Sequence, residues 1–476
     1  MVDGQMTGTT RTERPKRPLP FLQPEYCKGC GRCIPACPKH CITFDDVVNA
    51  ESGLLPVHID FTDCNACGLC ITACPEPYGL HGDDIHYDWE LTDPAAEFGE
   101  RTSTAPEPVD LPGESIPLPA TEPLLTKGTY AASMGALLAG CRHFFGYPIT
   151  PSTEGAELMA RVLPNLDGVF VQAVSEVATI NHMYGCGGAG LPSMTFTSSP
   201  GFSLMLEGIS YLIGSEIPGV IVNIMRAGPG LGNIAPAQAD IKLACRGLGH
   251  GNTHAIVFAP ADPQEMLDLT MLSFELSFRY RHPVVILGDG YLGQVTGKVR
   301  LPDHMIKPGL PAWAVWGDEM HRGNLHASIR LQEDDQEAFN AFLNDKYATM
   351  IATEQRSDLF RCDDAEILFV ASNTPSRTVK GVIQELRRQG VKAGLFRPIT
   401  LWPFPIDALA GALDGVRRLI VVEASAGQLE DEVRLALSKA GITDHPPIEH
   451  VRRMGGNLPE AADVFEVVAG EEGVVA

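Results

Sequence analysis

The sequence lacks an excess of basic residues. Its 476 residues include 36 Lys and Arg against 59 Asp and Glu, which gives a formal net charge of −23. A nucleic-acid-binding protein presents a basic face, so this balance argues against a nucleic-acid partner. The sequence also lacks any apolar run of the length that a membrane span needs. We expect a globular protein of two to four domains whose acidity serves solubility and the choice of partners.

Two other features are missing. Residues 1–20 are polar and have no apolar core, so we expect a disordered tail and not a signal peptide. The glycines of Gly228-x-Gly230-x-Gly232 do not form a dinucleotide fingerprint, because the third glycine comes too early and no helical pattern follows. If a nicotinamide is the final electron acceptor, its site must lie on another subunit.

Cysteine, by contrast, is concentrated in one stretch. Eight of the 13 cysteines form two runs of the pattern Cys-x-x-Cys-x-x-Cys-x-x-x-Cys-Pro. The runs are made by Cys27, Cys30, Cys33 and Cys37, and by Cys64, Cys67, Cys70 and Cys74. This is the pattern of bacterial two-cluster ferredoxins, in which the fourth cysteine of each run binds the other cluster. Zinc sites use paired Cys-x-x-Cys units without the trailing proline, and a disulfide framework needs no such spacing.

We therefore expect two [4Fe–4S] clusters in a bacterial-type ferredoxin domain at residues 21–87. One cluster would take Cys27, Cys30, Cys33 and Cys74, and the other Cys64, Cys67, Cys70 and Cys37. Short strands are expected at 42–44 and 55–59, and Cys41 is expected to be a small core residue near the first cluster. The other cysteines are scattered, which fits a reducing cytoplasm.

The rest of the chain alternates between strand and helix patterns. Residues 88–123 are rich in proline and predict an extended linker. Residues 124–300 predict a doubly wound α/β domain, and 301–364 a connecting segment with a helix near 336–346. Residues 365–476 return to a smaller α/β domain. The expected strands are 168–173, 193–198, 219–225, 282–287, 365–371 and 419–423. The expected helices are 128–141, 176–184, 378–389 and 430–440. We also expect Ser175 to be the N-cap of the helix at 176–184, and a turn at Pro200-Gly201.

Several strings in these domains resemble one family. The run 139–154, which includes Tyr147-Pro148-Ile149-Thr150-Pro151, is similar to the alpha subunit of the 2-oxoacid:ferredoxin oxidoreductases. Strings at 175–178, 197–205, 225–229 and 396–403 also resemble that subunit, over about three quarters of the chain. The segment Gly228-Pro229-Gly230-Leu231-Gly232-Asn233 looks most like the branched-chain 2-oxoacid members.

The resemblance implies a fold and a reaction. It implies that 124–300 is the pyrimidine-binding domain for thiamine diphosphate and that 365–476 is a transketolase C-terminal-like domain. It implies oxidative decarboxylation of a 2-oxoacid to acyl-CoA and CO2, with electrons passing through the [4Fe–4S] clusters to ferredoxin or another acceptor. A partner beta subunit would hold the diphosphate and Mg²⁺, coenzyme A would be a co-substrate, and a gamma subunit is expected. Such a chain is inactive alone.

The resemblance also assigns roles to residues. Glu176 matches the carboxylate that contacts the aminopyrimidine, and its place after a strand and at a helix start predicts partial desolvation. Thr150 is expected to contact the substrate, and Pro148 and Ile149 the cofactor. Arg226 could pair with a carboxylate, or form a structural ion pair. Ser199 and Phe202 are expected to line the same pocket.

Other signals are discounted. Gly288-Asp289-Gly290 imitates the start of the magnesium–diphosphate motif of thiamine enzymes, but no asparagine completes it in the expected window, so we expect a strand-end turn. His250 and His254 are read as polar surface. Substrates other than branched-chain or aromatic acids, namely 2-oxoglutarate and pyruvate, stay open. So does a different class of protein, an electron-transfer or scaffold subunit with a non-catalytic thiamine domain.

Overall fold

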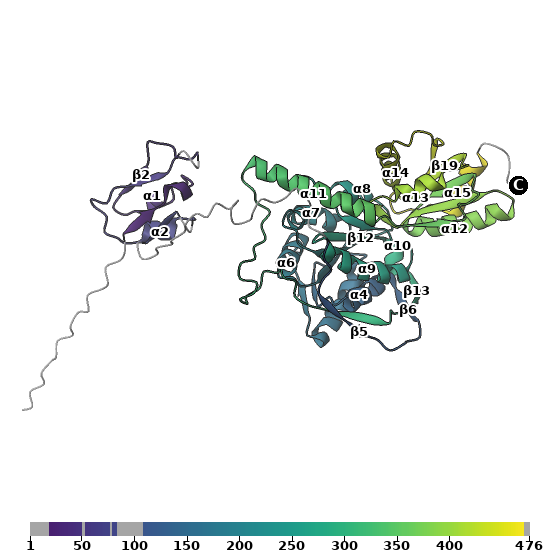
Figure 1. Ribbon diagram of the computed structural model, residues 1–476, viewed down its shortest axis with the longest axis horizontal. Helices are drawn as coiled ribbons and strands as arrows, with labels where there is room; N and C mark the ends of the chain where they lie inside the picture. Colours follow the sequence, from purple (N-terminus) through teal and green to yellow (C-terminus); the bar gives the residue numbers. More distant parts are fainter. Residues whose placement is uncertain (1–18, 50–52, 77–78, 83–107, 471–476) are drawn as a thin grey trace, which may run out of the picture. The chain divides into compact units, whose positions relative to one another are not determined.

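The computed structural model describes residues 19–49, 53–76, 79–82 and 108–470 (Figure 1). The chain divides into two compact units, Met1–Arg101 and Thr102–Ala476, which we describe separately. The expected tail, except for its last two residues, and the expected linker up to residue 107 lie outside the described residues. Among the helices that are described, none is both long and apolar enough to cross a membrane.

The first unit consists of short elements around the cysteines. Two antiparallel strand pairs, β1 with β4 and β2 with β3, enclose a few buried apolar residues, among them Ile42, Val57 and Leu80. Such a small core gives little stability, so a unit of this kind relies on bound metal to fold. The expected strand at 42–44 is confirmed, and the second begins two residues later than expected. The elements are β1 (Pro20–Leu22), η1 (Pro24–Tyr26), α1 (Cys33–Ala36), β2 (Ile42–Phe44), β3 (Val57–Ile59), α2 (Leu69–Ala73) and β4 (Leu80–Gly82).

The second unit is built on a seven-stranded sheet with the order β18-β11-β12-β10-β9-β7-β8. All neighbours are parallel except β18, which runs antiparallel to β11. The central strands are buried along their whole length, as expected for a parallel sheet covered on both faces. The strands are β7 (His143–Gly146), β8 (Val169–Gln172), β9 (Ser193–Thr197), β10 (Gly219–Met225), β11 (Ile256–Phe258), β12 (Pro283–Asp289) and β18 (Thr400–Trp402).

Helices connect these strands, which confirms the doubly wound α/β fold. The helices are α4 (Gly128–Leu138), α5 (Thr153–Val162), η2 (Leu163–Leu166), α6 (Glu176–Gly188), α7 (Ser199–Gly214), α8 (Ile241–Arg246), α9 (Pro263–Arg279) and α10 (Gly290–Gln294). Two local expectations were wrong. Strand β8 is not buried, because it lies at the edge of the sheet, where Val169 is 42% exposed. Pro200 and Gly201 do not form a turn but begin α7, since proline lacks only an N–H that a first helical turn leaves unpaired.

Segments expected to be irregular also pack on this unit. Strand β5 (Gly113–Pro117) pairs with β14 (His304–Pro308), and β6 (Leu124–Lys127) pairs with β13 (Thr296–Val299). The end of the proline-rich segment is therefore part of the folded unit. The expected helix at 336–346 is present as the longer α11 (Glu333–Thr353).

A second sheet follows with the order β15-β17-β16-β19-β20. Its strand β15 comes from the segment that we expected to be only a connection. Strand β18 leaves this region to complete the large sheet, so the two α/β parts share a sheet. The elements are β15 (Ser357–Phe360), β16 (Ile367–Val370), α12 (Asn373–Arg388), β17 (Ala393–Pro398), α13 (Ile406–Ala412), β19 (Arg418–Glu423), α14 (Gln428–Lys439), β20 (Ile448–Arg452) and α15 (Ala461–Ala469).

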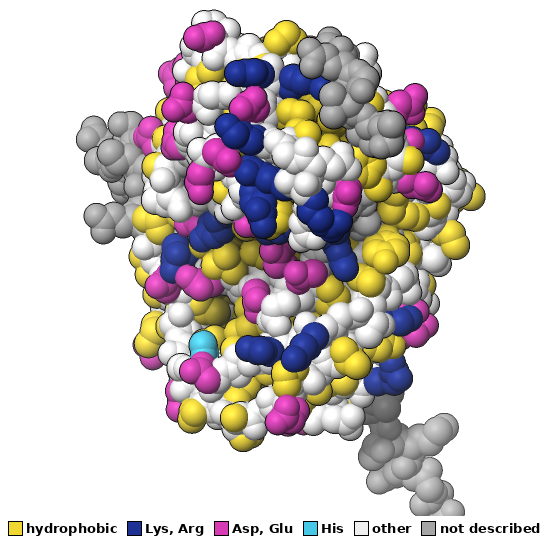
Figure 2. Space-filling model, turned by 90° about the vertical axis from the view of Figure 1, so that its right-hand side faces the viewer, with side chains coloured by type: hydrophobic (Ala, Val, Ile, Leu, Met, Phe, Trp, Pro, Cys, Tyr) yellow, Lys and Arg dark blue, Asp and Glu magenta, His cyan; other side chains and the backbone are white. Residues whose placement is uncertain are grey.

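Charged side chains of both signs cover the outside of this region. Figure 2 shows one face on which Lys and Arg side chains gather near the centre, with Asp and Glu side chains beside them. Many are paired: Arg387 lies 2.7 Å from Asp364, and Lys380 lies 2.7 Å from Asp358. Exposed pairs of this kind add little to stability.

Candidate functional site

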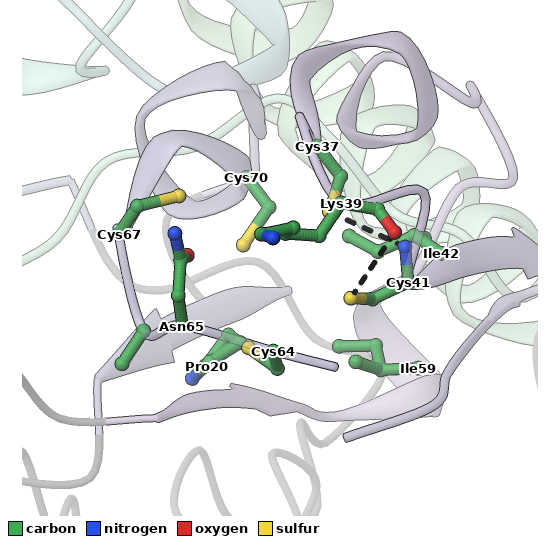
Figure 3. A pocket seen from close by; sticks show the side chains of 12 residues that line it. Pro20, Cys37, Lys39, Cys41, Ile42, Ile59, Cys64, Asn65, Cys67 and Cys70 are labelled. Atoms are coloured by element: carbon green, nitrogen blue, oxygen red, sulfur yellow. Dashed lines mark hydrogen bonds between the residues drawn. The ribbon is translucent and has the colours of Figure 1, made fainter. Parts of the chain in front are cut away.

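The eight cysteines of the two runs line two separate cavities in the first unit. One cavity is lined by Cys27, Cys30, Cys33 and Cys74, and the other by Cys37, Cys64, Cys67 and Cys70 (Figure 3). Each run thus sends its fourth cysteine to the other cavity, in agreement with the pairing expected from the sequence. Among the described residues no three such side chains are placed to hold a single metal ion; each set surrounds a space instead.

The backbone shows why three cysteines of each run reach one cavity. Gly29 and Gly31 adopt φ of 60° and 68°, and Ala66 and Gly68 adopt 52° and 77° at the corresponding positions of the second run. A Cβ atom on Gly29 would stand 2.4 Å from the Leu55 carbonyl oxygen, so this position requires glycine. Such left-handed residues turn the chain sharply between one cysteine and the next.

The thiols suit iron–sulfur clusters chemically. Burial raises the pKa of the Cys33 thiol to about 11, and burial also raises the pKa of Cys70. A buried thiolate is costly unless a cation binds it, and soft thiolate ligands in sets of four are what iron–sulfur clusters take.

Cys41 lies in a different place from the expected one. It lines the cavity of Cys37, Cys64, Cys67 and Cys70, and not that of the first three cysteines. Its backbone N–H donates to Cys37 Sγ at 3.4 Å, and its side chain is 7% exposed. The cause is the crossing of the fourth cysteine, which carries the residues after Cys37 to the second cavity.

In the second unit, Glu176 is buried at the start of α6. Ser175 caps this helix, as expected, by accepting a hydrogen bond from the Ala178 N–H at 3.2 Å. The Glu176 side chain is 5% exposed and lies against Gly201 of α7. A Cβ atom on Gly201 would stand 2.5 Å from Glu176 Oε1 and 2.4 Å from Thr197 Oγ1, so only glycine lets the carboxylate lie there.

Arg226 joins two loops at the same edge of the sheet. Its Nη1 donates to the Thr150 carbonyl at 2.8 Å and its Nη2 to the Leu231 carbonyl at 3.1 Å. The structure therefore places Arg226 beside Thr150, where it contacts the backbone carbonyl of Thr150 and not its side chain. Among the described residues, no carboxylate lies within ion-pair distance of Arg226. Arg226 is 6% exposed, which suits a residue that positions loops.

The loop around Thr150, residues 147–151, has several side chains that are accessible to solvent. Pro148 and Thr150 are exposed, and Ile149 is half-buried. Two hydrogen bonds hold the backbone of this loop in place: Gln294 donates to the Pro151 carbonyl at 3.2 Å, and Ser152 donates to the Ile149 carbonyl at 2.7 Å. It can thus present Thr150 without further ordering.

A buried polar network connects the loop edge to the core. Ser199 Oγ lies 2.5 Å from Asp240 Oδ2, accepts from the Arg226 N–H at 3.0 Å, and lies 3.1 Å from the Arg226 carbonyl. Asn223 donates to Asp240 Oδ2 at 2.9 Å. Burial raises the pKa of Asp240, while Ser199, Asn223 and the positive charge of Arg226 lower it. The sequence analysis did not identify Asp240 or Asn223 as site residues. Asn223 could have been found, because an asparagine in the otherwise apolar strand 219–225 indicates a buried polar contact.

Four buried side-chain atoms at this edge make no hydrogen bond to the described protein. They are Thr197 Oγ1, Ser198 Oγ, Asn223 Oδ1 and Arg226 Nε. Buried polar atoms are normally paired, so this edge is suited to a polar ligand. Exposed apolar side chains surround it; Val174 is 88% exposed and Leu231 is 80% exposed.

Three expectations about neighbouring residues need correction or support. Phe202 is fully buried in the core, so it does not line an open pocket in this chain. His254 is not polar surface, because its ring stacks on Trp402 at 4.8 Å; His250 is exposed. Asp289 is fully buried and accepts hydrogen bonds from the backbone of Leu292 and from Thr374. The expected strand-end turn at Gly288-Asp289-Gly290 is wrong, because β12 continues through Asp289 and α10 begins at Gly290, with Asp289 as its N-cap.

Comparison with known proteins identifies the domains in which the two sites lie. Residues 134–342 match the family model described as pyruvate flavodoxin/ferredoxin oxidoreductase, thiamine diphosphate-binding, and residues 365–464 match core domain II of pyruvate:ferredoxin oxidoreductase. Residues 26–77 match a 4Fe-4S dicluster domain.

Two curated relatives each match 72% of this chain. The ketoisovalerate oxidoreductase subunit VorB of Methanothermobacter thermautotrophicus is 46% identical over 346 residues, which are 72% of this chain and 96% of that protein. The 2-oxoglutarate synthase subunit KorA of Methanocaldococcus jannaschii is 34% identical over 370 residues, 72% of this chain and 98% of that protein.

A solved structure is also similar. It is the 2-oxoglutarate:ferredoxin oxidoreductase from Magnetococcus marinus with 2-oxoglutarate, coenzyme A and succinyl-CoA bound, with a TM-score of 0.65 and 26% identity. The match covers 74% of this chain and 65% of the solved chain, so this chain spans about two thirds of that length.

Proposed function

The chain belongs to the 2-oxoacid:ferredoxin oxidoreductases, as an alpha-type subunit with an N-terminal ferredoxin domain, and on that premise we propose that it oxidises branched-chain 2-oxoacids to acyl-CoA and CO2. The observation that carries the catalytic part is the buried Glu176 carboxylate at the N-terminus of α6 against Gly201. The substrate rests on the higher identity with the ketoisovalerate subunit than with the 2-oxoglutarate subunit.

Thiamine diphosphate, when bound, supplies the carbanion-stabilising chemistry that the decarboxylation of a 2-oxoacid requires. Glu176 would accept a hydrogen bond from the aminopyrimidine ring, and its burial keeps water from competing for that bond. Thr150 would contact the substrate from its fixed loop, while Pro148 and Ile149 would pack against the cofactor. Ser199 and Arg226 hold the loops that carry these groups.

The cysteine sets would hold two [4Fe–4S] clusters. The set of Cys27, Cys30, Cys33 and Cys74 and the set of Cys37, Cys64, Cys67 and Cys70 would each bind one cluster. The clusters, when bound, would supply one-electron transfer towards ferredoxin or another acceptor. A two-electron oxidation of substrate thus needs both clusters, or two transfers through one.

We propose that the thiamine site is completed by a beta subunit. Five large apolar side chains of the loops and helices near this edge are exposed, namely Val174, Val177, Leu204, Leu231 and Ile234, and exposed apolar surface beside polar residues is typical of a protein–protein contact. Asp289, already engaged by Leu292 and Thr374, is poorly placed to bind Mg²⁺, so the diphosphate and metal would lie on the partner. A gamma subunit and a cytoplasmic location are part of the same proposal, and no cysteine among the described residues forms a disulfide, which fits a reducing compartment. The domain boundaries that we propose are 21–87, 124–300 and 365–476.

The experiment uses the native complex, purified without oxygen. Single 2-oxoacids are added with thiamine diphosphate and coenzyme A, and the visible absorbance of the clusters is followed. Bleaching by 3-methyl-2-oxobutanoate that depends on thiamine diphosphate supports the proposal. Bleaching by 2-oxoglutarate, pyruvate or an aromatic acid instead would replace the substrate but keep the reaction.

A second outcome would change the class of protein. If no 2-oxoacid bleaches clusters that dithionite still reduces, the chain is an electron-transfer subunit. Glu176→Gln tests this directly, because it removes the charge and keeps the shape of the side chain. Turnover by the assembled complex should fall at least about 100-fold, the size of a general acid–base contribution, whereas Glu157→Gln on the exposed face of α5 should leave turnover unchanged.

A further inference from the structure

The loop that follows β10, residues 227–237, places a leucine beside the Thr150 loop. Arg226 Nη1 donates to the Thr150 carbonyl at 2.8 Å, and Nη2 of the same guanidinium donates to the Leu231 carbonyl at 3.1 Å. The two carbonyls are therefore separated by no more than two hydrogen bonds and the width of one planar group. Leu231 is thus a neighbour of Thr150, the residue that is expected to contact the substrate.

The backbone of this loop turns sharply on both sides of the leucine. Leu231 stands between Gly230 and Gly232, whose φ angles are 67° and 57°. A Cβ atom on Gly232 would stand 1.7 Å from the Ala227 carbonyl oxygen, so this position requires glycine. The Asn233 N–H donates to the same carbonyl at 3.1 Å and closes the turn. The loop sequence therefore fixes the backbone position of Leu231.

The side chain of Asn233 attaches the loop at a second point. Its Nδ2 donates to the carbonyl of Gly455, which lies after β20, at 3.0 Å. Its Oδ1 accepts from the Ala235 N–H at 2.8 Å. The loop is therefore held by the smaller α/β part as well as by Arg226. A ligand that contacts Leu231 would lose little to ordering of this loop.

The chemistry of the loop suits an aliphatic group. The Leu231 side chain is 80% exposed, and residues 227–237 include no charged residue. Both Nη atoms of Arg226 already donate to carbonyls. The aliphatic side chain of a branched 2-oxoacid would gain from contact with such an apolar surface. The second carboxylate of 2-oxoglutarate, in contrast, would find no lysine or arginine on this loop to compensate its loss of water.

We infer that Leu231 contacts the aliphatic side chain of the 2-oxoacid and thereby favours branched-chain substrates. The inference deepens the proposed function and rests on it, since it takes Thr150 to contact the substrate. Leu231 would act on the side chain of the acid alone and not on its carboxylate or oxo group. A branched acid would bury more apolar surface against Leu231 than pyruvate, whose side chain is one methyl group. Leu231 is therefore expected to discriminate between acids by the size of that side chain.

The test is the ratio of two kcat/KM values measured on the assembled complex. 3-Methyl-2-oxobutanoate has an isopropyl group where pyruvate has a methyl group, and the two acids are otherwise alike. Leu231→Ala should lower the ratio of the branched acid to pyruvate by about five- to tenfold, because apolar contacts with the larger side chain are lost. Leu231→Met keeps an apolar side chain of similar volume and should hold the ratio within about twofold. An unchanged ratio in Leu231→Ala would overturn the inference.

Leu331 provides a matched control at the opposite edge of the sheet. Its side chain is 83% exposed, and its neighbour Arg330 donates to the Gly214 carbonyl at 3.2 Å. Gly214 ends α7 just before β10 begins, whereas Arg226 follows the end of β10. Leu331→Ala should therefore leave the ratio of the two acids unchanged. A change as large as that in Leu231→Ala would show that the effect does not depend on the Thr150 loop and would refute the inference.

Two further outcomes separate this inference from its alternatives. An equal loss with both acids in Leu231→Ala, or failure of that variant to assemble, would assign Leu231 to the contact with the partner subunit and overturn the inference. The unmodified complex tests the proposed function by itself. If it prefers the branched acid while Leu231→Ala keeps the same ratio, only the inference fails. If the unmodified complex prefers 2-oxoglutarate, or oxidises no 2-oxoacid, the proposed function fails and the inference fails with it.

Discussion

The carboxylate of Glu176 and the α-carbon of Gly201 are so close that no Cβ atom fits between them. A Cβ atom on Gly201 would stand 2.5 Å from Glu176 Oε1. Helix α6 therefore presents Glu176 only because α7 has a glycine in its first turn. A residue without a side chain thereby takes part in placing the carboxylate.

Gly201→Ala should displace Glu176. The new methyl group would overlap both Glu176 Oε1 and Thr197 Oγ1, so we expect a stability loss of about 1 to 3 kcal/mol and a loss of thiamine-dependent turnover. The clusters should still be reduced by dithionite. Gly185→Ala in α6 is the matched control, because nothing lies within 4 Å of its Cβ position and alanine favours helix. Full turnover by Gly201→Ala would show that the position of Glu176 is not critical.

Ser199 is expected to matter more than its neighbour one turn along α7. Ser199 Oγ bonds to buried Asp240 and to the backbone of Arg226, whereas Ser203 is exposed. Ser199→Ala leaves Asp240 with one polar partner fewer and should cost about 1 to 3 kcal/mol, while Ser203→Ala should stay within about 0.5 kcal/mol. Chemical denaturation of the two variants compares them. Similar unfolding midpoints would mean that the network contributes little.

The features that could be predicted from the sequence are those fixed by nearby residues. The cysteine runs determine their own turns through Gly29, Gly31 and Gly68, and the cap at Ser175 acts on the next three residues. The apolar strands 219–225 and 283–289 are recognisable because both faces are buried. These elements needed no knowledge of the tertiary structure.

The features that could not be predicted depend on distant partners. Strand β5 forms only because residues 304–308 lie beside it, and β18, which begins at residue 400, completes a sheet whose first strand begins 257 residues earlier, at residue 143. Asp240 became a site candidate only when the fold brought Ser199 and Asn223 to it. The family resemblance placed Phe202 at the pocket, whereas its side chain is fully buried in the core.

Substitution of a single cysteine should remove one of the two clusters and leave the other bound. Cys74→Ser should affect the cluster of Cys27, Cys30 and Cys33, although Cys74 belongs to the second run. We expect roughly half of the iron to be lost, since each set of four thiolates holds one cluster. Iron analysis and electron paramagnetic resonance of the reduced protein measure this. Cys41→Ser is the control and should keep all of the iron, because the four other cysteines complete its cavity. Iron loss from Cys41→Ser comparable to that from Cys74→Ser would show that Cys41 is a ligand.

Glu432 should make the stability of the second unit depend on pH. Burial raises the pKa of its carboxyl group to about 7, although Arg246 Nε lies 2.8 Å away and opposes the shift. The folded state therefore holds a proton that the unfolded state releases near its ordinary pKa of 4.5. Between these two values stability should fall as pH rises, by at most about 1.4 kcal/mol per pH unit, and level off above pH 7. Glu432→Gln should remove this slope and stabilise the chain at pH 8, whereas Ser438→Ala, at an exposed position of α14, should keep it. Thermal unfolding midpoints from pH 5 to pH 8 distinguish the variants. Identical slopes for Glu432→Gln and the unmodified chain would mean that Arg246 keeps Glu432 ionised throughout.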